Sequence, residues 1–401
     1  MAPPTPMVYR PAMKKDTRIL HAGRHPEQFN GAVNPPVYHA STILHASVAA
    51  MESSGKTPFE GVRYGRFGTP TTFALEEAVA ELEGGHRSVA TSSGLAAITG
   101  ALMAFLKTGD HLLMTDSAYF PTRKFCDSVL AGLGIETTYY NPCVGGAIAG
   151  LMRPNTKVVF TESPGSLTFE VQDIPAIAAA AHAGGAVVMM DNTWGVLNFQ
   201  PFTKGVDISI QAATKYIVGH ADAMLGAITA ATPELWLKVK TSVAAFGQSP
   251  GAEEMYLGLR GLRTLAVRLR HHQATALRLT TWLEGRPEVD RVLFPPLASD
   301  PGHELWRRDF SGGCGLFGVI LKPATKAAVD AMLDGYAHFK LGFSWGGFES
   351  LVIPTTGHSI IRSASDWTPV GPSLRFHAGL EDADDLIADL EQGFERLASC
   401  A

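Results

Sequence analysis

The sequence predicts an α/β fold in which a mixed, mostly parallel sheet is covered by helices on both faces and is followed by a smaller α+β domain. Short apolar, β-branched segments such as 110–116, 157–163 and 186–192 alternate with helical segments such as 94–106. That alternation is typical of parallel strands buried between two helical layers. After about residue 285 the pattern changes, which indicates a second domain.

The other elements of the larger domain follow from the same periodicities. Residues 73–85 place Leu75, Val79 and Leu82 at helical spacing and end in a Gly pair, so we expect an amphipathic helix with a C-terminal stop. Further strands are expected at 135–140 and 207–214, and further helices at 175–183 and 253–285.

The C-terminal part mixes strand-like and helical segments without regular alternation, which favours an α+β domain. Its expected strands are 289–295, 315–322 and 374–380, and its expected helices are 327–336 and 384–397. We therefore expect an N-terminal arm (1–60) that contacts a neighbouring subunit, a larger domain (61–260) and a C-terminal domain (261–401).

Composition narrows the class of partner. The 401 residues are 46% hydrophobic and 18% charged, which suits a protein with a large buried core. The formal net charge of -5 gives no electrostatic reason to expect nucleic acid or an anionic membrane. A small molecule is the expected partner.

The chain shows no pattern of a metal site, a disulfide framework or a membrane segment. Its four cysteines are far apart and form no CxxC pair, so we expect reduced thiols. The pair His271-His272 lies on an Arg-rich helix, which predicts a solvated or interfacial face rather than metal ligands. Residues 1–16 lack the apolar core of a signal peptide, and we expect a cytoplasmic protein.

Two charged residues follow predicted strands. Asp191 ends a buried strand, where an unpaired carboxylate is costly. It could cap a turn or helix, or it could pair with a protonated pyridine nitrogen. Lys215 is the only charged residue between Asp207 and Asp222, and a desolvated lysine suits Schiff-base chemistry, although a lysine reaching to the surface fits the same pattern.

Two further segments could bind a phosphate. Residues 91–94 (TSSG) directly precede a predicted helix, whose first backbone N–H groups can bind an anion, although such a segment can also be a plain helix cap. Tyr64 and Arg66 lie in a Gly-rich loop, and an arginine can fork onto a phosphate.

Taken in chain order, these pieces resemble the Cys/Met-metabolism branch of fold-type I enzymes that use pyridoxal 5'-phosphate (PLP), and most closely its cystathionine β-lyases. The likeness covers nearly the whole chain and implies the three-layer, aspartate aminotransferase-like fold of PLP-dependent transferases for the larger domain. The strings that carry it are YGRFGTPT, SSGLAA, TDSAYFPTRKFC, NTKVVFTESPGS, VVMMDNTWGVL, DISIQAATKYIVGHADAM, RGLRTLAVRLRHH, GHELWRRDFSGGCGLF, SWGGFESL and RFHAGLED.

The resemblance implies a role for each matching residue. Lys215 would form the Schiff base with PLP and act as general base, and Asp191 would pair with the pyridinium nitrogen. Tyr119 would stack on the ring and help to deprotonate the incoming substrate amine. Phosphate contacts would come from Ser93, Gly94, Leu95 and Thr214 of one subunit and from Tyr64 and Arg66 of its neighbour. A site shared in this way implies a homodimer, which this family usually doubles to a homotetramer.

The substrate would be bound mainly through its carboxylate. Arg375 matches the arginine that forks onto the substrate α-carboxylate, with Ser344 and Trp345 beside it and Tyr64 as a further contact. An arginine inside an apolar, strand-like segment needs an anionic partner in any case, and an internal salt bridge would also meet that need.

Departures from the γ-acting relatives favour elimination at the β-carbon. Those enzymes usually have YGGT after the ring-stacking tyrosine and a glutamate just before the serine of SxGG, whereas this chain has AYFPT and Phe343. Trp345 stands where they commonly have leucine. Thr69 replaces the asparagine of YxRxxNPT, and residues 212–215 read AATK in place of SxTK, which removes one phosphate-facing hydroxyl.

The resemblance therefore implies a carbon–sulfur lyase that converts L-cystathionine to homocysteine, pyruvate and ammonia, a step of transsulfuration and methionine biosynthesis. Cystine and other cysteine S-conjugates are further expected substrates. The alternatives are cystathionine γ-lyase, cystathionine γ-synthase or methionine γ-lyase of the same family. A non-catalytic PLP-binding regulator is disfavoured, because Lys215 is present and no helix-turn-helix extension is seen.

Overall fold

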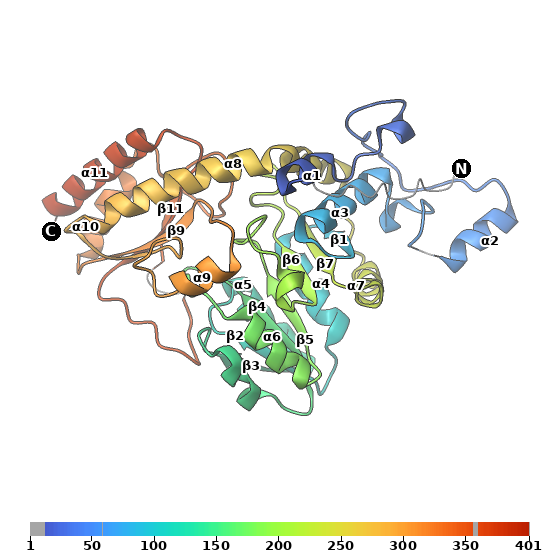
Figure 1. Cartoon of the computed structure of the whole chain (residues 1–401), viewed down its shortest axis with the longest axis horizontal. Coiled ribbons are helices and arrows are strands. Elements are labelled where there is room, and N and C mark those ends of the chain that lie inside the picture. Colours follow the sequence, from blue (N-terminus) through green and yellow to red (C-terminus); the bar gives the residue numbers. More distant parts are fainter. Residues whose placement is uncertain (1–12, 58, 356–359, 401) are drawn as a thin grey trace.

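The computed structural model describes residues 13–57, 59–355 and 360–400 (Figure 1). A seven-stranded sheet forms its larger part. In spatial order the strands are β1 (Arg87–Thr91), β7 (Gly226–Ala230), β6 (Ile208–Gln211), β5 (Val187–Asp191), β4 (Thr156–Glu162), β2 (His111–Thr115) and β3 (Glu136–Tyr140).

The direction of the strands determines where polar groups gather. β7 is antiparallel to both β1 and β6, and the remaining neighbours pair in parallel. Six strands therefore point the same way and end at one edge of the sheet. The predicted mixed, mostly parallel sheet is confirmed, although the sequence pattern predicts neither β1 nor β7.

Helices cover both faces of this sheet. α4 (Gly94–Phe105) and α7 (Pro233–Ala245) pack on one face. α3 (Pro70–Glu83) and α6 (Ile174–Ala183) pack on the other. The result is the three-layer arrangement expected for the larger domain.

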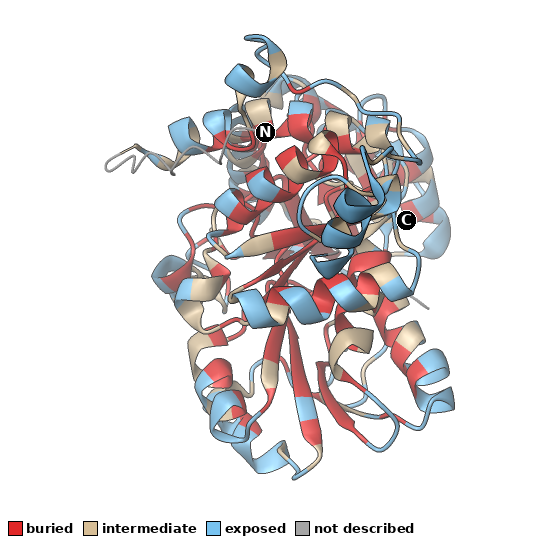
Figure 2. Cartoon of the chain, turned by 90° about the vertical axis from the view of Figure 1, so that its right-hand side faces the viewer, coloured by how far each residue is buried: buried red, intermediate tan, exposed pale blue. Residues whose placement is uncertain are grey.

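Neighbouring residues of each central strand alternate between the two cores. Leu112 and Val158 belong to the core under α4, whereas Leu113 and Val159 belong to the core under α3 and α6. Figure 2 shows these strands as an almost continuous buried band between helices whose outer faces are exposed. This burial on both faces explains why the strands read as continuous apolar runs.

A second, five-stranded sheet forms the C-terminal part and is covered by helices that pack on one another and on the long helix α8. α8 extends from the first sheet to the second in Figure 1. The bounds are α8 (Ala252–Glu284), α9 (His303–Asp309), α10 (Lys326–Asp334) and α11 (Ala383–Ser399), with strands in the order β10 (Lys340–Leu341), β11 (Leu351–Pro354), β12 (Ser373–His377), β9 (Leu316–Leu321) and β8 (Val289–Leu293).

The N-terminal segment lies beside the first sheet and carries α1 (Lys15–His21) and α2 (Val48–Lys56), the latter standing away from the rest of the chain in Figure 1. Residues 1–12 and 58 of the predicted arm lie outside the described part. The predicted domain limits stay a prediction, and residue 260 falls within α8. Other short elements are α5 (Phe120–Phe125), a π-helical turn (Cys126–Leu130) and 3-10 turns at Pro26–Phe29, Gly65–Phe67, Gly145–Leu151 and Pro201–Lys204.

Candidate active site

Polar side chains gather at the edge where six strands of the larger sheet end. Glu162 and Asp191 are the last residues of β4 and β5 and are paired in register. Ser93 follows β1 by two residues, and Lys215 follows β6 by four. Ligands of open α/β sheets bind at this edge, so the strand order alone brings the candidate residues together.

Lys215 points inward, toward the C-terminal part of the chain. Its Nζ donates a hydrogen bond of 2.6 Å to the hydroxyl of Ser344 and lies 5.5 Å from the ring centroid of Trp345. The pKa of Lys215 is lowered to about 8, mainly by burial and in addition by the nearby Arg375, while Asp191 opposes both. The surface-lysine interpretation therefore does not fit, and the amine is neutral to a greater extent than that of free lysine.

Asp191 is held by the turn that follows β5. It is 8% exposed, and its Oδ1 accepts hydrogen bonds from the backbone N–H of Thr193 at 3.0 Å and from the Thr193 hydroxyl at 2.5 Å. Burial raises its pKa, although these two hydrogen bonds counteract that effect. Both hydrogen bonds found in the described chain fall on Oδ1, so the turn-cap interpretation accounts for one oxygen and leaves Oδ2 for another donor.

Arg375 lies in β12 as a buried cation. It is 8% exposed, and its Nη2 donates to the backbone carbonyl of Ser344 at 2.9 Å. Within the described residues it forms no salt bridge with a carboxylate, and its Nε has no hydrogen-bond partner. Burial lowers its pKa to about 10. An internal salt bridge therefore does not explain this arginine, whose free donors suit an anionic ligand.

The start of α4 can bind an anion. Ser93 is the N-cap of this helix, and its hydroxyl accepts a hydrogen bond from the backbone N–H of Ala96. The N–H groups of Gly94 and Leu95 lie in the first turn, where a helix offers them no carbonyl partner. A Cβ on Gly94 would lie 2.5 Å from that of Ala212, so the close approach of the two segments requires glycine.

Thr214 does not present a free hydroxyl. Its Oγ1 donates to the carbonyl of Leu225 at 3.1 Å and accepts from the Leu225 N–H at 2.8 Å. The hydroxyl therefore joins the segment after β6 to β7. Its assignment to a phosphate stays a prediction.

Tyr119 stands beside this edge and is 45% exposed. Its backbone N–H donates to Glu162 Oε2 at 2.8 Å. Burial raises the pKa of the phenol, and the carboxylates Glu162 and Asp191 raise it further, so the phenol stays protonated at neutral pH. Glu162 was not predicted as part of the site, although it ends a predicted strand just as Asp191 does.

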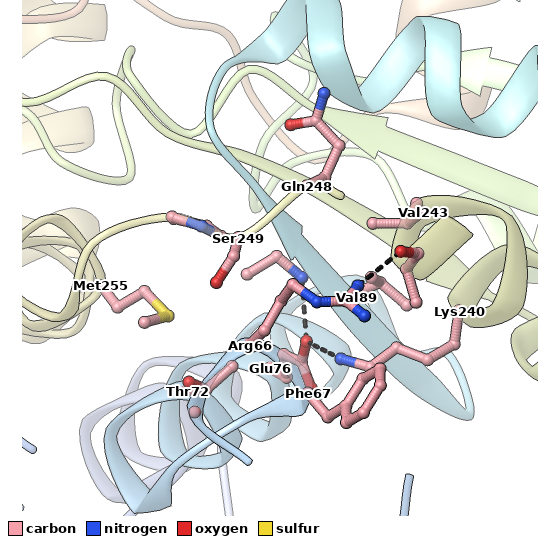
Figure 3. A pocket seen from close by; sticks show the side chains of 14 residues that line it. Arg66, Phe67, Thr72, Glu76, Val89, Lys240, Val243, Gln248, Ser249 and Met255 are labelled. Carbon is pink, nitrogen blue, oxygen red and sulfur yellow. Dashed lines mark hydrogen bonds and ion pairs between the residues drawn. The ribbon is translucent and has the colours of Figure 1, made fainter. Parts of the chain in front are cut away.

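Tyr64 directly precedes the 3-10 turn Gly65–Phe67, and Arg66 of this turn contacts the C-terminal end of α7. Arg66 Nη1 donates to the carbonyl of Ala244 at 2.6 Å, and Tyr64 is 40% exposed. Figure 3 shows the pocket beside Arg66, where a buried ion pair of 2.9 Å joins Lys240 and Glu76. The contact of Tyr64 and Arg66 with the site of a neighbouring subunit stays a prediction.

His272 differs from its expected surroundings. It is fully buried, its Nδ1 lies 2.8 Å from the carbonyl of Ala378, and its ring packs against those of Tyr216 and His377. The expectation of a solvated side chain is wrong here, because this face of α8 packs against the end of β12, whereas His271 is exposed. All four cysteines, which lie in the described part, are free thiols as expected.

Comparison with known proteins agrees with this geometry. Residues 16–395 match the family described as Cys/Met metabolism PLP-dependent enzyme. Cystathionine beta-lyase of Salmonella typhimurium is 44% identical over 390 residues, which cover 95% of this chain and 98% of that protein. Cystathionine beta-lyase of Escherichia coli K12 is 43% identical over 392 residues, covering 96% and 99%.

Solved structures give the same result for the fold. The crystal structure of cystathionine gamma synthase from Xanthomonas oryzae in complex with cystathionine matches with a TM-score of 0.89 and 31% identity, covering 97% of this chain and all of that one. Family and fold therefore agree over nearly the full length. This chain belongs to the Cys/Met metabolism family of PLP-dependent enzymes.

Proposed function

We propose that this protein is a carbon–sulfur β-lyase that splits L-cystathionine into homocysteine, pyruvate and ammonia, and that it also acts on cystine and other cysteine S-conjugates. One observation carries the proposal: Ser344 contacts both the Lys215 amine and the Arg375 guanidinium. A base and a carboxylate-binding cation therefore lie within reach of one small amino acid. Relatives named cystathionine beta-lyase support cystathionine as that substrate.

The residues fit PLP at three points. The first N–H groups of α4 suit a phosphate, the unused Oδ2 of Asp191 suits a protonated ring nitrogen, and the Lys215 amine suits the aldehyde. When bound there, PLP withdraws electrons from the substrate and so stabilises negative charge at its α-carbon. The phosphate contacts of Ser93, Gly94, Leu95 and Thr214 belong to this proposal.

The remaining steps follow from the protein's own groups. Arg375 binds the substrate carboxylate and thereby fixes which bond at the α-carbon faces the Lys215 amine. Lys215 takes the α-proton, for which its lowered pKa suits it at neutral pH. Asp191 would be held ionised by a protonated ring nitrogen, against the burial that raises its pKa, and Tyr119 would lie over the ring. The β-carbon–sulfur bond then breaks, its electron pair leaves on sulfur as the thiolate, and water later releases pyruvate and ammonia.

Elimination at the β-carbon fits the residues near Ser344 better than elimination at the γ-carbon. Reaction at the γ-carbon also requires removal of a proton from the β-carbon, which an additional acid–base group beside Ser344 would assist. Phe343, which directly precedes Ser344 and is 89% exposed, offers none. Trp345 adds an apolar surface beside the amine.

The active form is a homodimer with shared sites, doubled to a homotetramer. Within one chain Arg66 donates to the carbonyl of Ala244 and Tyr64 is 40% exposed, and the arm that precedes them carries exposed apolar side chains such as Leu44 at 90% and Val48 at 68%. A second copy would bury these side chains and bring Tyr64 to the substrate. No helix in the described ranges is long and apolar enough to span a bilayer. The cytoplasmic location stays a prediction.

The test is to incubate the purified, PLP-loaded protein with L-cystathionine and to identify the keto acid and the thiol. Pyruvate with homocysteine supports elimination at the β-carbon. 2-Oxobutyrate with cysteine would contradict it and point to a γ-lyase. If neither pair forms, cystine is the next substrate, and inactivity toward both would refute the lyase proposal.

A further inference from the structure

The turn that carries Ser344 is held in an unfavourable backbone conformation. Ser344 has a φ of +73° and Gly346 a φ of +86°, both in the left-handed region, which costs energy for a residue with a Cβ. The turn passes so close to Lys215 that a Cβ on Gly346 would lie 2.9 Å from the Lys215 carbonyl carbon. Such a conformation persists only where surrounding contacts impose it.

Three hydrogen bonds hold residues 344–346 of this turn. The Lys215 amine and the Arg375 guanidinium bind the hydroxyl and the carbonyl of Ser344, and His377 Nε2 accepts a hydrogen bond of 3.0 Å from the Gly346 N–H. The first two groups belong to the proposed chemistry and exchange partners when substrate binds. Of these three, His377 is therefore the contact that can hold residues 344–346 throughout the reaction. Further along the turn, the Leu380 N–H donates to the carbonyl of Phe348 at 2.7 Å.

The geometry determines the protonation of His377. Its Nε2 accepts a hydrogen bond and so carries no proton, and its Nδ1 donates to the carbonyl of Glu349 at 3.2 Å. The ring is fully buried and packs against Tyr216 and His272. Burial holds the pKa of His377 well below its ordinary value, and the neighbouring His272, Arg375 and Lys215 lower it further. The imidazole is neutral, with both nitrogens used.

His377 and Arg375 are two residues apart in β12 and so extend from the same face of the strand. We propose that His377 is a positioning residue, whose neutral imidazole ties the 344–349 turn to β12 and thereby sets the substrate-carboxylate cation in register with the Lys215 amine. This inference rests on the proposed function of that site. It assigns to His377 no contact with the substrate.

Two substitutions separate the two hydrogen bonds. His377→Gln places an amide oxygen near the position of Nε2 and keeps the acceptor for Gly346, whereas His377→Asn keeps a donor near Nδ1 and loses that acceptor. A buried N–H left without an acceptor is costly, so we expect the asparagine variant to raise KM for cystathionine about tenfold, and the glutamine variant to change it less than about threefold.

A second readout does not depend on turnover. Hydrogen exchange of the PLP-loaded protein, followed by mass spectrometry on peptides that cover 343–350, should be faster in His377→Asn than in the wild type and unchanged in His377→Gln. His272→Asn is the matched control, because it disturbs the same ring cluster without removing the Gly346 acceptor, and the 343–350 peptides should keep wild-type exchange.

Two results would overturn the assignment: unchanged exchange in His377→Asn, or equal behaviour of the asparagine and glutamine variants. If His377→Asn does not fold, His377→Gln, which keeps the Gly346 acceptor, decides the question. Exchange at 343–350 that is faster than in the wild type would then refute the inference, and exchange at the wild-type rate would support it. If the wild type fails to act on cystathionine, the exchange experiment still decides the role of His377 while the proposed function alone is refuted.

Discussion

The Lys215 amine and the Ser344 hydroxyl are joined by a hydrogen bond of 2.6 Å, which connects the edge of the larger sheet to the C-terminal sheet. The carbonyl of the same serine binds Arg375 of β12. The distance between the proposed base and the proposed carboxylate-binding cation is therefore set by how the two sheets pack, and substitutions on either side should alter catalysis.

Replacing Lys215 with alanine should abolish turnover. The variant loses the amine that holds the cofactor and takes the α-proton, and loss of a general base alone typically costs 10²–10⁴-fold. Steady-state assays with L-cystathionine measure the loss, and the circular dichroism spectrum checks the fold. A variant within about tenfold of the wild-type rate would show that Lys215 is not the base.

Three residues of the candidate site could be predicted from the sequence because each places a charge where the surrounding sequence is apolar. Lys215, Asp191 and Arg375 are charged residues in or beside apolar, strand-like segments, where a charge requires a partner or a function. His377 was not predictable in the same way. Its partner Gly346 lies 31 positions away along the chain, so only the packed structure brings the two together.

Some elements of the fold could likewise be predicted from the sequence, and others could not. The strands with continuous β-branched runs and the amphipathic helices were placed from periodicity alone, within one or two residues of the observed bounds for β2 and α4. β7 was missed because its sequence, GAITA, is short and has only two β-branched residues among glycine and alanines. Its antiparallel direction depends on its pairing with β1 and β6, which local sequence does not encode.

The Lys215 amine should react at a lower pH than free lysine does. Burial lowers its pKa to about 8, so the neutral, nucleophilic form should increase up to about pH 8 and then level off. Acetylation of the cofactor-free protein over a pH series, with the Lys215 peptide followed by mass spectrometry, measures the inflection.

Two substitutions test the electrostatic origin of that shift in opposite directions. Arg375 lowers the pKa of Lys215, so Arg375→Leu should move the inflection to higher pH. Asp191 raises it, so Asp191→Asn should move the inflection to lower pH. An inflection near 10.4, the ordinary value for lysine, would contradict the burial of this amine.

Arg375→Lys should weaken substrate binding while retaining the positive charge. Lysine cannot fork onto a carboxylate through two parallel N–H groups, so we expect KM for cystathionine to rise about 10- to 100-fold. A smaller fall in kcat should follow from poorer orientation at the α-carbon. An unchanged KM would show that the carboxylate binds elsewhere. Cystathionine amide lacks the carboxylate charge, so the factor by which it is a poorer substrate than cystathionine should be smaller in this variant than in the wild type.

Asp116 should prove important for stability and for attaching the segment at 363–365. Its buried carboxylate accepts hydrogen bonds from Arg123 at 2.9 Å and from the backbone N–H groups of Ser363, Ala364 and Ser365 at 2.8 to 3.0 Å. Replacing Asp116 with asparagine removes the negative charge, and the NH2 group of the asparagine side chain then faces donors that had bound the carboxylate. Breaking a buried pair in this way typically costs about 3–5 kcal/mol.

Urea unfolding measures that loss, and Asp127→Asn is the matched control. Asp127 lies 3.8 Å from the same guanidinium but is largely exposed, so its replacement should cost less than about 1 kcal/mol. Burial opposes ionisation of Asp116, but the hydrogen bonds outweigh it and lower its pKa below the ordinary value. The stabilisation is therefore present above about pH 4 and is lost as the pH falls through the lowered pKa. Acid unfolding of the wild type should thus begin at a lower pH than it would if Asp116 had an ordinary pKa. Equal free energies of unfolding for Asp116→Asn and Asp127→Asn would refute the role of Asp116.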